Sequence, residues 1–157
     1  MKTSYLLPSK FKLFGWALFL VGLITGILIY LNNFESDFLT VKVFAIYNDN
    51  SFFDNNKGFF KFIDNSIIDE LAAIAIIIGG FFVGFSKEKE EDEFISKLRM
   101  DSLAWAMIVN YTILILSILF IYEMTFFNVL VFNMFTPLIF FIIRFNFLKY
   151  KAGSHEE

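Results

Sequence analysis

Four long runs of apolar residues without a charge constrain the fold of this chain more than any other feature of its sequence. A helix needs about 20 such residues to cross a hydrocarbon core about 30 Å thick, and the runs cover residues 13–31, 71–86, 102–122 and 124–143. The second run reaches that length once Ile67 and Ile68 are added and Asp69 and Glu70 lie at the interface. The sequence therefore predicts an all-α membrane protein, a single membrane domain over residues 1–157 with transmembrane helices at about 13–31, 68–86, 102–122 and 124–144.

Composition agrees with this interpretation and excludes several kinds of chemistry. The chain is 57% hydrophobic and only 18% charged, whereas soluble domains average about 45–50% apolar and about 25% charged residues. It has no cysteine and a single histidine, His155, so thiolate sites, iron–sulfur clusters and paired-histidine haem ligation are excluded. The net charge of −3 gives no reason to expect a nucleic-acid partner. Phosphate-loop, dinucleotide and serine-hydrolase motifs are absent too, so we expect no cofactor, no metal and no catalytic residue.

The distribution of lysine and arginine predicts how the chain lies in the membrane. On one side of the predicted membrane, the segment between the first two apolar runs contains three basic residues: Lys42, Lys57 and Lys61. Ten fall on the other side: Lys2, Lys10, Lys12, Lys87, Lys89, Lys97, Arg99, Arg144, Lys149 and Lys151. Because basic residues concentrate on the cytoplasmic side, we expect both termini in the cytoplasm. The first run is too long for a signal core, and no small-residue cleavage site follows it, so it is predicted to be an uncleaved anchor.

The two long connections differ in character. The outer loop, residues 32–67, contains a β-branched and aromatic stretch at 38–47 and a turn signal at 54–58, which favour a small hairpin-like extracytoplasmic cap. Alternatively, the phenylalanine pairs at 52–53 and 59–60 lie among the lipid headgroups. The inner segment, residues 87–101, is predicted to be an amphipathic cytosolic helix that continues into the third span.

Small residues line the first two predicted spans. If these spans are antiparallel neighbours, Gly26 lies opposite Ala75, Gly22 opposite Gly79 and Gly15 opposite Gly84. Small faces let helix backbones approach closely in lipid. We expect packing within the chain, and the alternative is an interface of a homo-oligomer. The candidate packing residues are Gly15, Gly22, Gly26, Gly79, Gly80 and Gly84.

Two amides are predicted near the membrane midplane. Asn110 lies in the third span and Asn133 in the fourth, and Pro137 frees the carbonyl of Asn133 from its helical hydrogen bond. A buried amide is costly unless it is paired. We expect a hydrogen bond between the two side chains, and the alternative is a polar site for an ion, water or a small solute.

Carboxylates gather at both predicted membrane boundaries. Asp69, Glu70 and Glu123 lie at the outer boundary, where they favour helix N-termini; the alternative is a cation-binding or proton-accepting ring at an outer mouth. At the inner boundary Asp101 is expected to pair with Arg144. The inner acidic run is either a solvated face or a docking site for a cytosolic partner through Glu90, Glu91, Asp92 and Glu93.

Residues 69–73, 87–99 and 132–146 resemble an uncharacterised group of small four-helix integral membrane proteins from Bacteroidetes-type bacteria. The likeness covers roughly residues 67–147, about half of the chain, and is most specific in the inner segment. It implies a bacterial cytoplasmic (inner) membrane and favours a signalling or accessory role, but it brings no activity or site residue with it.

The function most favoured by the sequence is that of a non-enzymatic membrane accessory or sensor protein. It would act through a cytosolic or membrane partner, with membrane lipid around it. The alternative is a small oligomeric channel or transporter built around the two midplane amides. A membrane enzyme is disfavoured, because nothing in the sequence places a nucleophile beside an acid or a base.

Overall fold

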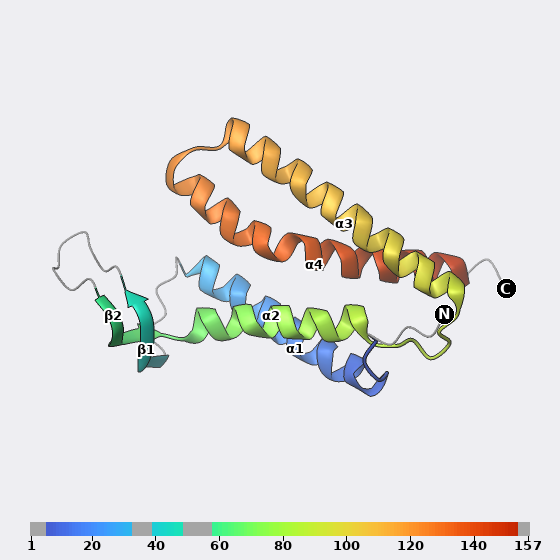
Figure 1. Cartoon of the computed structure of the whole chain (residues 1–157), viewed down its shortest axis with the longest axis horizontal. Helices are drawn as coiled ribbons and strands as arrows, with labels where there is room; N and C mark the ends of the chain where they lie inside the picture. The colour runs from blue at the N-terminus through green and yellow to red at the C-terminus, as the bar shows by residue number, and fades with distance from the viewer. Residues whose placement is uncertain (1–5, 33–38, 49–57, 154–157) are drawn as a thin grey trace. The chain divides into compact units, whose positions relative to one another are not determined.

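The computed structural model describes residues 6–32, 39–48 and 58–153, and it contains four helices and two strands (Figure 1). In chain order these are α1 (Lys10–Leu31), β1 (Thr40–Asn48), β2 (Gly58–Ser66), α2 (Ile68–Phe85), α3 (Glu93–Phe120) and α4 (Glu123–Gly153). All four helices are long and apolar enough to cross a membrane, so the number of candidate spans among the described residues equals the predicted four. Only 11% to 33% of the most apolar window of each helix is buried inside the protein. Most apolar side chains therefore face outward, as lipid-facing residues do.

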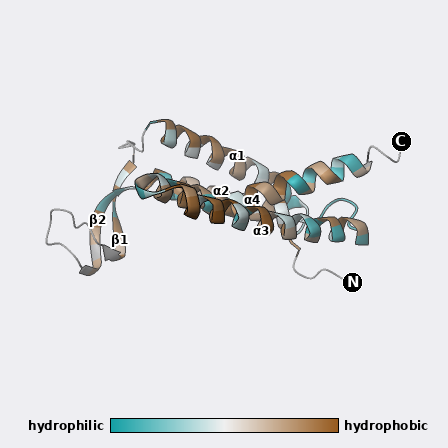
Figure 2. Ribbon diagram, turned by 90° about the horizontal axis from the view of Figure 1, so that it is seen from above, coloured by the Kyte–Doolittle hydropathy of each residue, from teal (hydrophilic) through white to brown (hydrophobic). Residues whose placement is uncertain are grey.

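The predicted inner helix over residues 87–101 begins later than expected. Residues 87–92 form a loop, and α3 starts at Glu93 behind Asp92, whose carboxylate accepts a hydrogen bond of 2.8 Å from the backbone N–H of Ile95. This is an N-cap, which satisfies a backbone donor that has no partner inside the helix. The predicted continuation into the third span is confirmed, because α3 runs unbroken to Phe120. Hydrophobic residues follow the helices, and hydrophilic residues gather in the last turns of α4 (Figure 2).

The chain divides into two compact units, Gly22–Ile74 and the combination of Met1–Val21 with Ala75–Glu157. The first unit contains an antiparallel hairpin in which Phe44 is paired with Phe62 and Lys42 with Asp64. The ring of Phe44 lies 5.4 Å from that of Phe62 and 6.1 Å from that of Phe60. The predicted strand and its hairpin pairing are therefore present. The expected turn at 54–58 and the pair at 52–53 lie outside the described residues, and the role of the hairpin as a cap stays a prediction.

The second unit has its core where the end of α2, the start of α3 and the second half of α4 meet. Val83, Ala106, Phe141, Ile142 and Phe145 are almost fully buried there. The rings of Phe141 and Phe145 stack at 6.1 Å, and that of Phe85 lies 5.6 Å from Phe141. This aromatic column fixes α4 against α2 at the end of the bundle that also carries the charged residues.

Glycines permit the closest helix contacts in this unit, with a register that differs from the expected one. A Cβ atom added to Gly15 would lie 2.5 Å from the Cβ of Phe82, and one added to Gly79 would lie 2.5 Å from the backbone nitrogen of Phe19. Gly15 therefore packs near Gly79, not opposite Gly84. Gly80 and Gly84 face α4 instead, where they contact Leu138 and Phe141. Gly22 is buried and Gly26 half-buried in the other unit.

Candidate functional site

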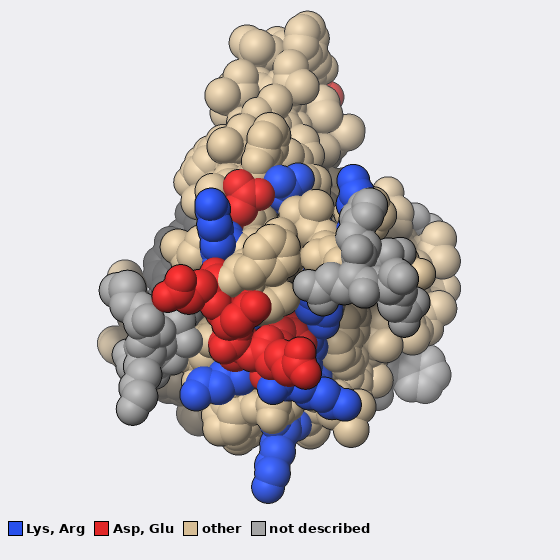
Figure 3. Space-filling model, turned by 90° about the vertical axis from the view of Figure 1, so that its right-hand side faces the viewer, with Lys and Arg blue, Asp and Glu red and all other residues tan. Residues whose placement is uncertain are grey.

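Ionic side chains from α1, the 86–92 loop, α3 and α4 gather at one end of the second unit, which we call the charged end. Figure 3 shows its acidic residues side by side, with lysine and arginine around them. Its paired members are Lys12, Glu88, Glu91, Arg99, Asp101, Arg144 and Lys149.

A short backbone bridge positions the loop that carries Glu88. The N–H of Leu7 donates to the carbonyl of Phe85 at 2.9 Å, and the N–H of Lys87 donates to the carbonyl of Leu7 at 2.9 Å. These two bonds form an isolated parallel β-bridge between Leu7 and Ser86. The bridge holds the segment before α1 against the end of α2, so that Glu88 emerges beside the first turn of α1.

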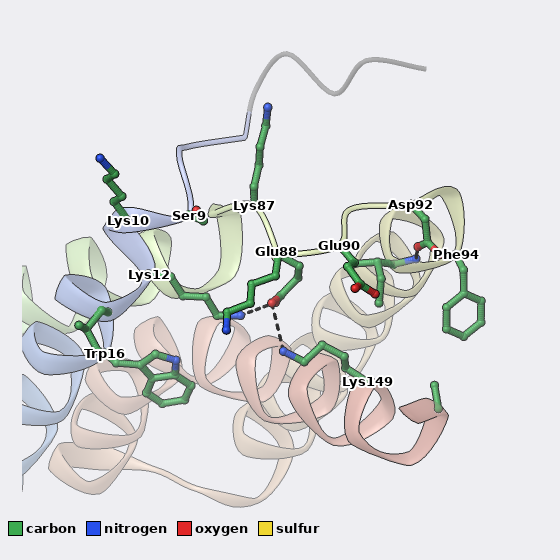
Figure 4. Close-up of a pocket in the computed structure, with 14 residues that line it drawn as sticks. Ser9, Lys10, Lys12, Trp16, Lys87, Glu88, Glu90, Asp92, Phe94 and Lys149 are labelled. Atoms are coloured by element: carbon green, nitrogen blue, oxygen red, sulfur yellow. Dashed lines mark hydrogen bonds and ion pairs between the residues drawn. The ribbon is translucent and has the colours of Figure 1, made fainter. Parts of the chain in front are cut away.

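The carboxylate of Glu88 links the first helix to the last. Its Oε1 pairs with Lys12 of α1, and its Oε2 accepts a hydrogen bond from Lys149 of α4 at 3.2 Å (Figure 4). Burial of the carboxylate disfavours its ionised form, but the hydrogen bonds and charges of the two lysines outweigh burial and hold the pKa of Glu88 below its ordinary value. Glu88 is therefore an ionised tie between two segments 137 positions apart in the sequence (149 − 12).

Arg99 is the most buried charge in the described part of the protein, with a relative exposure of 2%. Its guanidinium donates two hydrogen bonds to Glu91, at 2.6 and 3.0 Å, and a weaker one to the carbonyl of Ser86 at 3.4 Å. It also lies 5.1 Å from the ring centroid of Phe145. The bidentate pair of Arg99 and Glu91 is the strong form of an arginine–carboxylate interaction. It joins the loop, α3 and α4.

Glu91 completes this arrangement by bonding to two donors. Besides Arg99, it accepts a hydrogen bond of 2.9 Å from the backbone N–H of Glu88. Burial raises its pKa, while the hydrogen bond from Arg99, that from the Glu88 N–H and the nearby positive charges lower it more strongly. The net result is a pKa of Glu91 below the ordinary value for glutamate, so this carboxylate is ionised at neutral pH.

The sequence analysis counted Arg99 among the basic residues of the cytoplasmic side and did not predict its burial. The available signal was the helical spacing of α3, in which residues three, four or seven positions apart fall on one face. The buried positions of that helix are Arg99, Ser102, Ala106, Asn110 and Ser117. An arginine that continues a stripe of small residues lies on the packed face.

The expected pair of Arg144 and Asp101 is confirmed, with 2.9 Å between Nη2 and Oδ2. The guanidinium of Arg144 also lies 5.1 Å above the ring of Trp105. Arg144 therefore has both an acidic and an aromatic partner on α3. This contact ties α3 to α4 two residues beyond Arg99 in the sequence.

The four carboxylates that were predicted to dock a partner, Glu90 to Glu93, have different environments in the structure. Glu91 is bound to Arg99, and Asp92 caps α3. Glu90 and Glu93 are exposed, and no ion pair within the described residues engages either of them. Of the four carboxylates predicted to dock a partner, these two are therefore free among the described residues, and the side chain of Phe94 beside Glu93 is exposed.

The expected hydrogen bond between Asn110 and Asn133 is not formed. The Oδ1 atom of each is buried without a hydrogen-bond partner among the described residues, and a bond between the two amides needs one of these oxygens as acceptor. The nearby hydroxyls of Thr112, Ser117 and Thr136 donate to carbonyls of their own helices at 2.8 to 3.1 Å. Two buried acceptors in the spans are thus left unsatisfied, as is uncommon in native proteins.

The candidate outer carboxylates lie in different units. Asp69 and Glu70 are in the first turn of α2, where Asn65 donates a hydrogen bond to Glu70 at 2.7 Å. Glu123 is in the first turn of α4. All three are exposed. Their role as helix-terminal charges fits the helix dipole, and a shared outer ring stays a prediction.

Among the described residues, no group of three or more His, Cys, Asp or Glu side chains is arranged to hold a metal ion. No protein-family model, no curated protein and no solved structure matches this chain. The resemblance to small bacterial membrane proteins therefore stays an expectation from the sequence, and functional inference depends on the geometry of the charged end.

Proposed function

We propose that this protein is a non-enzymatic accessory or sensor protein of a bacterial inner membrane that acts through a cytosolic partner. In this proposal both termini and the charged end lie in the cytoplasm. The observation that supports it is the set of ion pairs that joins the 86–92 loop, the first turns of α3 and the last turns of α4, which we infer to form a charged projection.

The lengths of α3 and α4 support this projection. At about 1.5 Å per residue, the 28 residues of α3 extend about 42 Å and the 31 residues of α4 about 46 Å. A hydrocarbon core needs only about 30 Å. The surplus coincides with the charged residues, because the uncharged run of α3 begins after Asp101 and that of α4 ends before Arg144. About two turns of each helix thus extend beyond the core on this side.

The free surface of the projection has a defined chemistry. Glu90 and Glu93 are exposed and unpaired among the described residues, and the ring of Phe94, next to Glu93 in the sequence, is 53% exposed. Neighbouring charges are already bound within the protein. A partner that presents basic groups around an apolar pocket would complement this face.

A site-specific crosslinking experiment tests the proposal. A photo-reactive phenylalanine analogue at Phe94 should crosslink to one cytosolic protein in intact cells, and Glu90→Gln with Glu93→Gln should reduce that product at equal expression. The matched control places the analogue at Phe120, an exposed residue at the opposite end of α3. Equal crosslinking from both positions, or an unchanged product after neutralisation, would refute the proposal.

A second function is favoured by one observation, the unsatisfied oxygens of Asn110 and Asn133. Acceptors of this kind in a membrane span are candidates for a pathway of water or cations. Purified protein in proteoliposomes should then conduct, and Asn110→Leu should abolish the flux, whereas Thr112→Val on the exposed side of the same helix should not. Flux that is equal in the Asn110→Leu variant and the unaltered protein would exclude this function for the amide.

A further inference from the structure

A pocket of about 790 Å³ opens at the charged end, between the start of α1, the 86–92 loop, the first turn of α3 and the last turns of α4. Figure 4 shows that the ammonium groups of Lys12 and Lys149 point to Glu88, whereas the side chains of Lys10 and Lys87 extend away from it. The pocket lies within one compact unit, so its walls are fixed by the contacts described above.

The lining of the pocket is positively charged overall. It contains five lysines and three carboxylates, and so has an excess of two positive charges: the lysines are Lys10, Lys12, Lys87, Lys89 and Lys149, and the carboxylates are Glu88, Glu90 and Asp92. Glu88 binds two of the lysines. No ion pair within the described residues engages the other three, which leaves their charge for a ligand. A singly or doubly charged anion matches this excess.

The apolar residues of the pocket indicate what else the ligand carries. Leu13 and Trp16 line its wall within two turns of Lys10, and Leu13 is 81% exposed. The uncharged run of α1 begins at Leu13, so the lysines fall at headgroup depth and the apolar wall faces the first methylene groups of the acyl chains. Tryptophan is enriched at this depth. Basic residues above an apolar wall fit a phosphate joined to hydrocarbon.

We propose that this pocket binds the phosphate-bearing headgroup of an anionic phospholipid from the cytoplasmic leaflet. Lys10, Lys87 and Lys89 contact the phosphate, while Leu13 and Trp16 contact the glycerol end of the acyl chains. Glu88 keeps Lys12 and Lys149 in place at the base of the pocket. The pocket borders the partner-binding face, because Glu90 and Phe94 also line it, and it selects a lipid by charge.

Quenching of Trp16 fluorescence tests this proposal on the full chain. The other tryptophan is removed by Trp105→Phe in every sample, and the protein is placed in phosphatidylcholine vesicles that contain one tenth brominated phosphatidylglycerol or one tenth brominated phosphatidylcholine. We expect at least about twofold stronger quenching by the anionic lipid, because basic residues near a surface favour anionic lipids. Equal quenching by the two brominated lipids would overturn the proposal.

Two sets of variants and one competitor distinguish this site from general surface charge. Removal of the three free lysines (Lys10→Gln, Lys87→Gln and Lys89→Gln) should lower the apparent affinity for phosphatidylglycerol by about tenfold or more. Loss of two lysines on the same side of the membrane but outside the pocket lining (Lys97→Gln and Lys151→Gln) should leave it within about twofold. The same loss in both sets would overturn the proposal. Displacement of the brominated lipid by millimolar inorganic phosphate, with ionic strength held constant, would also overturn it in favour of a site for free phosphate.

Discussion

Neutralisation of Glu91 by Glu91→Gln is the most direct test of the structural role assigned to the charged end. In the unaltered protein the carboxylate of Glu91 accepts two hydrogen bonds from Arg99, which is 2% exposed. Glutamine retains the shape of glutamate and one acceptor oxygen, but it has no charge. The substitution therefore leaves a buried guanidinium with only the carbonyl of Ser86 and the ring of Phe145 as partners.

The size of the expected effect follows from these contacts. A hydrogen bond to a charged group contributes about 1.5–3 kcal/mol, and removal of one partner of a buried ion pair costs about 3–5 kcal/mol. Because glutamine keeps one of the two bonds, we expect Glu91→Gln to lower the free energy of unfolding by about 2–4 kcal/mol. Glu90→Gln is the matched control, since Glu90 is exposed and unpaired among the described residues, and the substitution should change stability by less than about 0.5 kcal/mol.

Unfolding of the purified protein in mixed micelles, with the fraction of a denaturing detergent increased stepwise, measures this difference. A double-mutant cycle with Arg99→Met should show that the loss from Glu91→Gln largely disappears when the arginine is absent. If Glu91→Gln and Glu90→Gln lower stability equally, or if the two substitutions in the cycle are additive, the buried pair does not hold this end together.

Three further predictions follow from other contacts. Protonation of Glu88 and Glu91 should lower the free energy of unfolding, because the pKa of each is lowered in the folded state. Their stabilisation is therefore complete above the unfolded-state pKa of about 4.3 and is lost as pH falls through the lower folded-state pKa values. A plot of the free energy of unfolding against pH should accordingly be flatter for Glu88→Gln than for the unaltered protein. Gly79→Ala should cost about 1–3 kcal/mol of stability in the same unfolding assay because the new methyl group meets backbone, whereas Gly80→Ala should cost less because it meets a flexible leucine side chain. With single cysteines, an impermeant reagent should label Ser51→Cys but not Ser154→Cys in intact cells, and the reverse pattern would contradict the predicted orientation.

The sequence was sufficient to predict the elements but not how they meet. The four spans follow from the absence of charge over some 20 residues at a time, a property that each segment has by itself. The hairpin strand likewise follows from its own β-branched and aromatic residues. In contrast, the pair of Lys12 and Glu88 joins residues 76 positions apart, and only the crossing of α1, α2 and α4 brings them together. The shifted register of Gly15 has the same origin. Equal depth in the membrane predicts which residue of the neighbouring helix lies opposite Gly15 only to within about one helical turn.

Local sequence signals were also open to more than one interpretation at the charged end. A run of acidic residues beside lysines is typical of an exposed helix, yet Asp92 ends the loop by capping α3 and Glu91 is bound by an arginine eight residues later. The midplane amides show the opposite case. Two polar groups at the same depth suggested a pair, but a hydrogen bond also needs side chains that point toward each other, and depth along a helix does not determine that direction.

The two-stranded hairpin has a consequence for handling the protein outside its membrane. In a sheet of only two strands each strand is an edge, and edge strands are where a third strand can pair. Phe44, Phe60 and Phe62 add an exposed aromatic surface to these edges. The cross-strand neighbours Lys42 and Asp64 are the only charged pair in the described register with opposite signs facing each other, and charges in such positions oppose stacking of one hairpin on another. Self-association through β-strand addition is therefore the expected failure after extraction into detergent, and this pair of charges is what restrains it.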